Sequence, residues 1–125
     1  MRLVIDSSIL IDYLRGGIIA KQLFDAIEKQ NHELFIPTIV IFELFSGTST
    51  NNPLVRRTIM NLISDFERIE LTEEIAIRAG ELYRQTGKHI SPQDYIIAAS
   101  ALEIGGTVVT LNKKHFKEIP HLRIW

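Results

Sequence analysis

The chain has 125 residues, 46% hydrophobic and 23% charged, so it can bury the core of one domain and is not expected to be disordered. It has no cysteine, which excludes disulfides and zinc–thiolate sites, and no apolar run approaches the roughly 18 residues of a membrane span. The net charge of −1 disfavours a dedicated high-affinity nucleic-acid binder, but it leaves open an enzyme that acts on nucleic acid. We therefore expect one soluble cytoplasmic domain over residues 1–125.

Two patterns predict the elements of the first half. Short apolar runs predict buried strands, and apolar residues spaced three and four apart predict helices that bury one face. Gly16 and Gly17 mark the end of the first helix. In chain order, the patterns predict a strand over residues 2–5, helices over 8–14 and 20–27, a strand over 34–36, and a helix from an N-cap at Thr38 to near Gly47.

The second half continues the alternation of helices and strands. Proline at the first turn of two helices and an almost wholly apolar stretch, 95–102, indicate one surface helix and one central helix. The predicted elements are a helix from Pro53 to Phe66, a strand over 68–71, a helix from Thr72 to Gly87, a helix from Ser91 to Gly105, and strands over 107–111 and 122–124. Together they predict an α/β domain with a mostly parallel sheet of four to five strands, flanked by helices on both faces.

Three carboxylates stand in unusually apolar surroundings. Asp6 closes the first strand, Glu43 lies within the apolar segment 39–45, and Asp94 opens the apolar central helix. Burying a carboxylate is costly unless it is hydrogen-bonded or bound to a cation. The three acids therefore predict one shared site, and their oxygen ligands suit a hard divalent cation, Mg²⁺ or Mn²⁺. Such a site suits the hydrolysis of a phosphodiester by an activated water.

Each acid also has a purely structural explanation. Asp6 can cap the following helix, Glu43 can be an exposed helix residue, and Asp94 lies three residues after Ser91, as in a capping box. The functional crevice of a parallel sheet lies outside the carboxyl ends of its strands, so Asp6 and Asn112 should both stand there. Spacing alone does not prove that the three acids converge, and both readings remain open.

A basic segment directly follows the fourth predicted strand. Between Lys113 and Arg123, four lysine or arginine side chains stand against one acid. Many such clusters are only solvated surface, but the position next to Asn112 makes this one a candidate for holding phosphates. The candidate substrate contacts are Asn112, Lys113, Lys114 and His115, with Lys117 and Arg123 as further cations and Arg56 and Arg57 as an alternative binding face.

Four segments of the chain can be compared with known families: Val4–Asp12, Ile41–Leu44, Asp94–Ala99 and Val109–Phe116. Taken together they resemble the PIN-domain ribonucleases, and most closely the VapC-type toxins of toxin–antitoxin modules. Each is weakly specific alone, but all four occur in order, and the resemblance covers essentially the whole chain. It implies a three-layer PIN-like fold and a Mg²⁺-dependent endoribonuclease that cuts structured RNA such as tRNA or rRNA. It also implies a homodimer held silent by a VapB-like antitoxin.

Position by position, the resemblance assigns Asp6, Glu43 and Asp94 as the metal-binding, catalytic acids. Ser8 matches the small hydroxyl residue two positions after the first acid. The chain departs from the four-acid pattern of many members, because Asn112 occupies the fourth-acid segment and His115 stands where others place an aspartate. A second metal would lack one charged ligand, so we expect a one-metal or weakly two-metal site.

Two other classes of protein compete with this interpretation. A non-catalytic PIN-like binding module would tolerate the missing fourth acid. A phospho-receiver domain has a similar length, but it needs adjacent acids after the first strand, and here Asp6 is followed by two serines. If the chain is a toxin, we expect an antitoxin helix to pack between the helices of residues 18–27 and 38–45.

Overall fold

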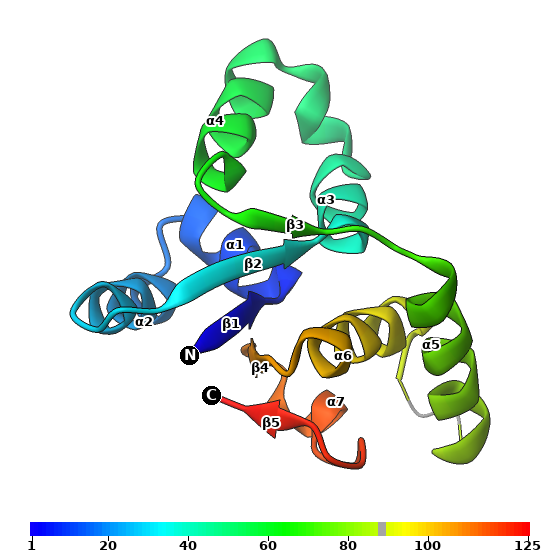
Figure 1. Cartoon of the computed structure of the whole chain (residues 1–125). Helices are drawn as coiled ribbons and strands as arrows, with labels where there is room; N and C mark the ends of the chain where they lie inside the picture. The colour runs from blue at the N-terminus through cyan, green and yellow to red at the C-terminus, as the bar shows by residue number, and fades with distance from the viewer. Residues whose placement is uncertain (88–89) are drawn as a thin grey trace.

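The computed structural model describes residues 1–87 and 90–125 and is built around a five-stranded parallel sheet (Figure 1). The strands are arranged in the order β3-β2-β1-β4-β5, and every neighbouring pair is parallel. Their bounds are β1 Arg2–Ile5, β2 Glu33–Pro37, β3 Glu67–Ile69, β4 Thr107–Val109 and β5 Arg123–Ile124. The predicted sheet is thus confirmed, with β3 and β4 shorter than the sequence pattern indicated.

The helices alternate with the strands as the sequence predicts. They are α1 Ser7–Leu14, α2 Ile18–Glu28, α3 Thr38–Phe45, α4 Pro53–Ile63, α5 Glu73–Gln85, α6 Pro92–Ile104 and α7 Lys113–Phe116, with a 3₁₀ turn at Thr48–Asn51. Side chains of Asn52, Thr72 and Ser91 accept hydrogen bonds from the first turns of α4, α5 and α6. Gly105, at φ +64°, ends α6 in the left-handed conformation that glycine adopts without strain.

Three predicted helix ends differ in the structure, and one of them is that of α4, which was predicted to reach Phe66 but ends at Ile63. Thr38 is the first residue of α3 rather than its N-cap, because Pro37 occupies the N-cap position with extended backbone and its fixed φ suits a helix entry. Helix α5 ends at Gln85 with Thr86 as its C-cap, before Gly87. The Thr86 hydroxyl donates to the Leu82 carbonyl at 2.8 Å, which satisfies a carbonyl of the last turn.

The strand order decides which helices cover which face. The chain moves from β1 to β2 to β3 in one direction, and then crosses back to β4 on the other side of β1. Because such crossovers are right-handed, α1–α4 cover one face and α5 and α6 the other, as in a three-layer α/β fold (Figure 1). Helices α3 and α6 nevertheless pack against each other where the two layers meet.

The core lies between the sheet and both helical layers. Leu3, Val4 and Ile5 of β1 are fully buried, as expected for a central strand covered on both faces. Gly106 lies so close to β1 that a Cβ there would be 2.9 Å from Val4 Cγ2 and 3.3 Å from the Arg2 carbonyl oxygen. Within the described residues, no helix is long and apolar enough to cross a membrane.

Candidate active site

The three acids predicted to share a site lie on elements that meet at the carboxyl edge of the sheet. Asp6 follows β1 directly, Glu43 lies on α3, and Asp94 lies in the first turn of α6. The contact between α3 and α6 brings the Glu43 and Asp94 elements together beside the end of β1. The structure therefore gathers residues that are up to 88 positions apart in sequence, because parallel strands end at one edge.

Asp6 is buried, and two hydroxyl groups hold its carboxylate. Ser8 Oγ and Thr110 Oγ1 each donate to Asp6 Oδ2 at 2.7 Å. Asp6 stands at the N-cap position of α1, but among the described residues its side chain accepts no capping hydrogen bond. Its side chain is therefore aimed at the β4 end rather than used as a helix cap.

The two hydroxyls connect Asp6 to the backbone that follows β4. Leu111 N donates to Ser8 Oγ at 3.0 Å, and Asn112 N donates to Thr110 Oγ1 at 2.9 Å. Each hydroxyl thus accepts from a backbone amide and donates its own proton to the same carboxylate oxygen. Both hydroxyl protons therefore point at one oxygen of the Asp6 carboxylate, Oδ2, which accepts them.

Glu43 is the least satisfied acid of the three. Its Oε1 atom is buried and has no hydrogen-bond partner among the described residues. Burial raises the pKa of Glu43 to about 7, with further increases from the negative charges of Asp6 and Asp94, while the nearby Ser7 hydroxyl acts in the opposite direction. A carboxylate with this pKa carries its charge readily only when a cation arrives to compensate it.

Asp94 is paired with a residue that the sequence had assigned to phosphate contact. His115 Nδ1 lies 3.2 Å from Asp94 Oδ2. Burial raises the pKa of Asp94, the charge of Asp6 raises it further, and the interactions with His115 and Ser91 lower it. The Ser91 side chain also accepts from Asp94 N at 3.3 Å, so the predicted capping contact and the acid cluster coexist.

The acids act on one another electrostatically, but they do not form a finished metal site. Among residues 1–87 and 90–125, no three His, Asp or Glu side chains are placed so that they could hold a metal ion as they stand. The charges of Asp6 and Asp94 nevertheless raise the pKa of Glu43 beyond the effect of burial, and that of Asp6 does the same for Asp94, so the three carboxylates lie within range of one another's charge. Like charges repel one another without a compensating cation, which accounts for three carboxylates that are near one another but do not converge on one point.

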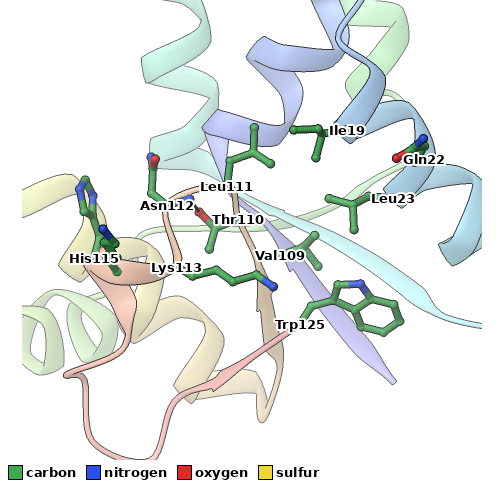
Figure 2. Close-up of a pocket in the computed structure, with 11 residues that line it drawn as sticks. Ile19, Gln22, Leu23, Val109, Thr110, Leu111, Asn112, Lys113, His115 and Trp125 are labelled. Carbon is green, nitrogen blue, oxygen red and sulfur yellow. Dashed lines mark hydrogen bonds between the residues drawn. The ribbon is translucent and has the colours of Figure 1, made fainter.

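A groove lies between α2, the end of β4 with the segment that follows it, and Trp125 after β5 (Figure 2). It has a volume of about 610 Å³, and we call it the Trp125 groove. Its walls are formed by Ile19, Gln22, Leu23, Val109, Thr110, Leu111, Asn112, Lys113, Lys114, His115 and Trp125. All the predicted substrate contacts except Ser8 therefore line one groove, although Lys117 and Arg123 do not.

A second groove opens on the other side of the acids, at Glu43. It lies between α1, α3 and α4, and Arg15 is the basic residue on its wall. Asp12, on α1, contacts the start of α2, where its Oδ2 accepts from Ala20 N at 3.0 Å.

Sequence reasoning missed Thr110, His115 as a partner of Asp94, and Ser7 near Glu43. Thr110 is buried within an otherwise apolar run, and a polar residue at the end of a central strand is the signal that could have indicated its role. The His115 pairing had no local signal, because the two residues are 21 positions apart.

Comparisons with known proteins agree with this geometry. The family model described as "PIN domain" matches residues 3–122. Ribonuclease VapC10 of Mycobacterium tuberculosis is 33% identical over 124 residues, which cover 97% of this chain and 90% of that protein. Ribonuclease VapC19 of the same species is 29% identical over 123 residues, or 96% of each chain.

Solved structures give the same result. The structure of VapBC2 from Rickettsia felis, bound to a DNA fragment from their promoter, has a chain with a TM-score of 0.85 and 26% identity, covering 100% of this chain and 98% of that one. A toxin–antitoxin complex from Klebsiella pneumoniae gives a TM-score of 0.77 at 31% identity, over 96% and 94% of the two chains. The chain therefore belongs to the PIN-domain family, and its similarity over nearly its whole length places it with the VapC-type ribonucleases. The predicted three-layer fold is confirmed.

Proposed function

We propose that this chain is the endoribonuclease of a toxin–antitoxin pair and hydrolyses a phosphodiester bond of structured RNA with the help of Mg²⁺ or Mn²⁺. The observation that carries the proposal is the acid cluster at the carboxyl edge of the sheet. Burial raises the pKa of Glu43 and of Asp94, the charge of Asp6 raises both further, and Glu43 Oε1 is buried without a hydrogen-bond partner among the described residues. A non-catalytic PIN-like module would gain nothing from this electrostatic cost.

The residues fit a hard divalent cation. All three acids present oxygen ligands, and both hydrogen bonds to Asp6 reach Oδ2, so that the described residues leave Oδ1 available. We propose Asp6, Glu43 and Asp94 as the ligands, with waters and phosphate oxygens in the remaining positions. When bound, the cation supplies charge to the phosphate and lowers the pKa of the attacking water. With Asn112 in the fourth-acid segment, one metal suits the charge of the site better than two.

The protein's own groups prepare this site before RNA arrives. Ser8 and Thr110 fix the orientation of the Asp6 carboxylate, and His115 restrains that of Asp94. Lys113 and Lys114 are exposed at the start of α7 and supply positive charge beside the acids. That charge is needed because the acids alone repel the RNA backbone.

We propose that a VapB-like antitoxin silences the enzyme, as suggested by the toxin–antitoxin complexes among the similar structures. The position predicted for the antitoxin helix lies between α2 and α3, both of which pack against α1. The groove that reaches Glu43 is instead lined by α1, α3 and α4, with Leu14, Leu54 and Val55 on its walls. A partner helix there would bury apolar surface and could direct a basic side chain to Glu43. We further propose a homodimer acting in the cytoplasm, where its RNA substrate is found.

The test compares RNA cleavage by the wild type with that by Asp6→Asn and Asp94→Asn at fixed Mn²⁺. Both variants should lose detectable cleavage while their far-UV circular dichroism stays unchanged. Asp25→Asn, at an exposed position of α2, is the matched control and should remain fully active. Wild-type rates in either acid variant would rule out the assigned site, and cleavage that persists in EDTA would rule out metal dependence.

A further inference from the structure

The Trp125 groove has the composition of a site for a flat, partly apolar ligand. Ile19, Leu23 and Leu111 provide aliphatic walls, and Trp125 provides an aromatic one (Figure 2). Its volume of about 610 Å³ lies within the range of pockets that bind small organic groups, roughly 300–1,000 Å³. A groove meant only to hold phosphates would not need these apolar walls.

Trp125 is restrained by contacts of both its ring and its backbone. His32 contacts Trp125 edge to face, with ring centroids 5.4 Å apart and an interplanar angle of 86°. Trp125 N also donates to the Val108 carbonyl at 2.8 Å, which ties the residue to β4. A fixed aromatic ring is a better stacking platform than a mobile one, because less conformational entropy is lost on binding.

Two residues that line the groove also contact the acid cluster. Thr110 lines it and donates to Asp6, and His115 lines it and contacts Asp94. Lys113 stands on the wall between these residues and Trp125, and in Figure 2 its side chain points in the direction of the indole. A ligand in the groove would therefore have its charged part next to the lysines and the acids, and its apolar part next to Trp125.

We propose that the Trp125 groove is a nucleobase subsite, which receives a base of the RNA adjacent to the phosphate that is cut. The inference deepens the proposed ribonuclease function and rests on it. The base stacks on Trp125 between Ile19 and Leu111, while its phosphate lies against Lys113 and Lys114. Stacking accepts any base, since every base has a flat π face. The Gln22 amide, which offers both a donor and an acceptor, adds selectivity for the edge of the base.

The chain provides its own reporter for this site. Trp125 is the only tryptophan, so intrinsic fluorescence excited at the indole band reports on the groove alone. We would titrate the protein in EDTA, where metal-dependent hydrolysis is suppressed, with single-stranded RNA hexamers and with a hexamer that is abasic at every position. The RNA hexamers should quench Trp125 saturably, and the abasic chain should bind the lysines without quenching.

Two neighbouring residues of α2 give a matched pair of variants. Ile19 lines the groove and is 58% exposed, whereas Ile18 is 72% exposed and does not line it. Both substitutions, Ile19→Glu and Ile18→Glu, add the same charge at almost the same place. Ile19→Glu should raise the RNA concentration needed for half-maximal quenching at least 10-fold. For Ile18→Glu this concentration should stay within about threefold of the wild-type value. Thermal melts confirm that both variants fold.

A second measurement removes the stacking platform itself. Trp125→Ala should weaken the binding of a dye-labelled hexamer, followed by anisotropy, by roughly 5- to 150-fold, the range for losing one base–aromatic stack. The inference is overturned if the abasic hexamer quenches as strongly as RNA, if Ile18→Glu and Ile19→Glu behave alike, or if only an antitoxin peptide quenches. These outcomes are separable from the ribonuclease proposal, because wild-type cleavage in Mn²⁺ is measured independently. Active enzyme without quenching refutes the subsite alone.

Discussion

Replacing Glu43 with glutamine should stabilise the metal-free protein at high pH and leave its stability unchanged at low pH. The pKa of Glu43 is about 7 in the folded chain, against 4.5 for the unperturbed group. The folded state therefore retains a proton that the unfolded chain has lost between these two values. As pH rises from about 4.5 to about 7, the wild type loses stability that the glutamine variant keeps, and above pH 7 the whole difference is present.

The size of the effect follows from the shift. A rise in the pKa of Glu43 from 4.5 to about 7 means that folding favours its protonated form over its charged form by about 3 kcal/mol. Glu43 is only half-buried, so solvent screening reduces the effect, and we expect Glu43→Gln to be about 1–2 kcal/mol more stable at pH 8. At pH 4.5 both side chains are neutral, and the difference should fall near zero.

Urea unfolding in EDTA at pH 4.5 and pH 8 measures both values. Glu81→Gln, at an exposed position of α5, is the control and should show little difference at either pH. Adding Mn²⁺ at pH 8 should reverse the order, because a ligand that binds only the folded state stabilises the chain that binds it better. A stability difference between Glu43→Gln and the wild type that does not change with pH, or a more stable wild type at pH 8 without metal, would refute the reasoning.

Four further outcomes are expected. At limiting Mn²⁺, wild-type cleavage should increase as pH rises through about 7, because metal binding competes with the proton on Glu43; a flat pH–rate profile would contradict this. Thr110→Val should lower metal affinity about 10- to 100-fold by calorimetry, whereas Thr110→Ser should restore it. Replacing Lys113 and Lys114 with alanine should weaken binding about equally for different RNAs and flatten its salt dependence, leaving metal affinity unchanged. Gly106→Ala should lower the melting temperature, since its Cβ would contact Val4 Cγ2 at 2.9 Å.

The sequence predicted the fold well where local chemistry decides the structure. Asn52, Thr72 and Ser91 begin their helices because each side chain satisfies a nearby amide, which a reader of the sequence can anticipate. The sequence predicted strands β3 and β4 to extend further than they do, because apolar residues continue beyond the last paired position of each. The short helix α7 was not predicted, since four residues carry no visible helical period.

The three acids of the candidate site could be proposed from the sequence, whereas their surroundings could not. Asp6 closes an apolar run, Glu43 interrupts one, and Asp94 opens one, which makes all three conspicuous. The Thr110 hydroxyl reaches Asp6 across 104 positions, and only the pairing of β1 with β4 brings the two together. The Trp125 groove could not be predicted from the sequence either, because no sequence pattern connects α2, the end of β4 and Trp125, which meet there.

The arrangement around Asp6 has a consequence for the cation that the proposed metal site would select. Because Ser8 and Thr110 both donate to Oδ2, one oxygen of this carboxylate is already committed, and Asp6 can offer only Oδ1 to an ion. A one-oxygen carboxylate suits the compact octahedral shell of Mg²⁺ and Mn²⁺, whereas Ca²⁺ prefers six to eight ligands and often takes both oxygens of an acid. The two hydroxyls thus bias the site against calcium, and Ca²⁺ should bind weakly and support little cleavage.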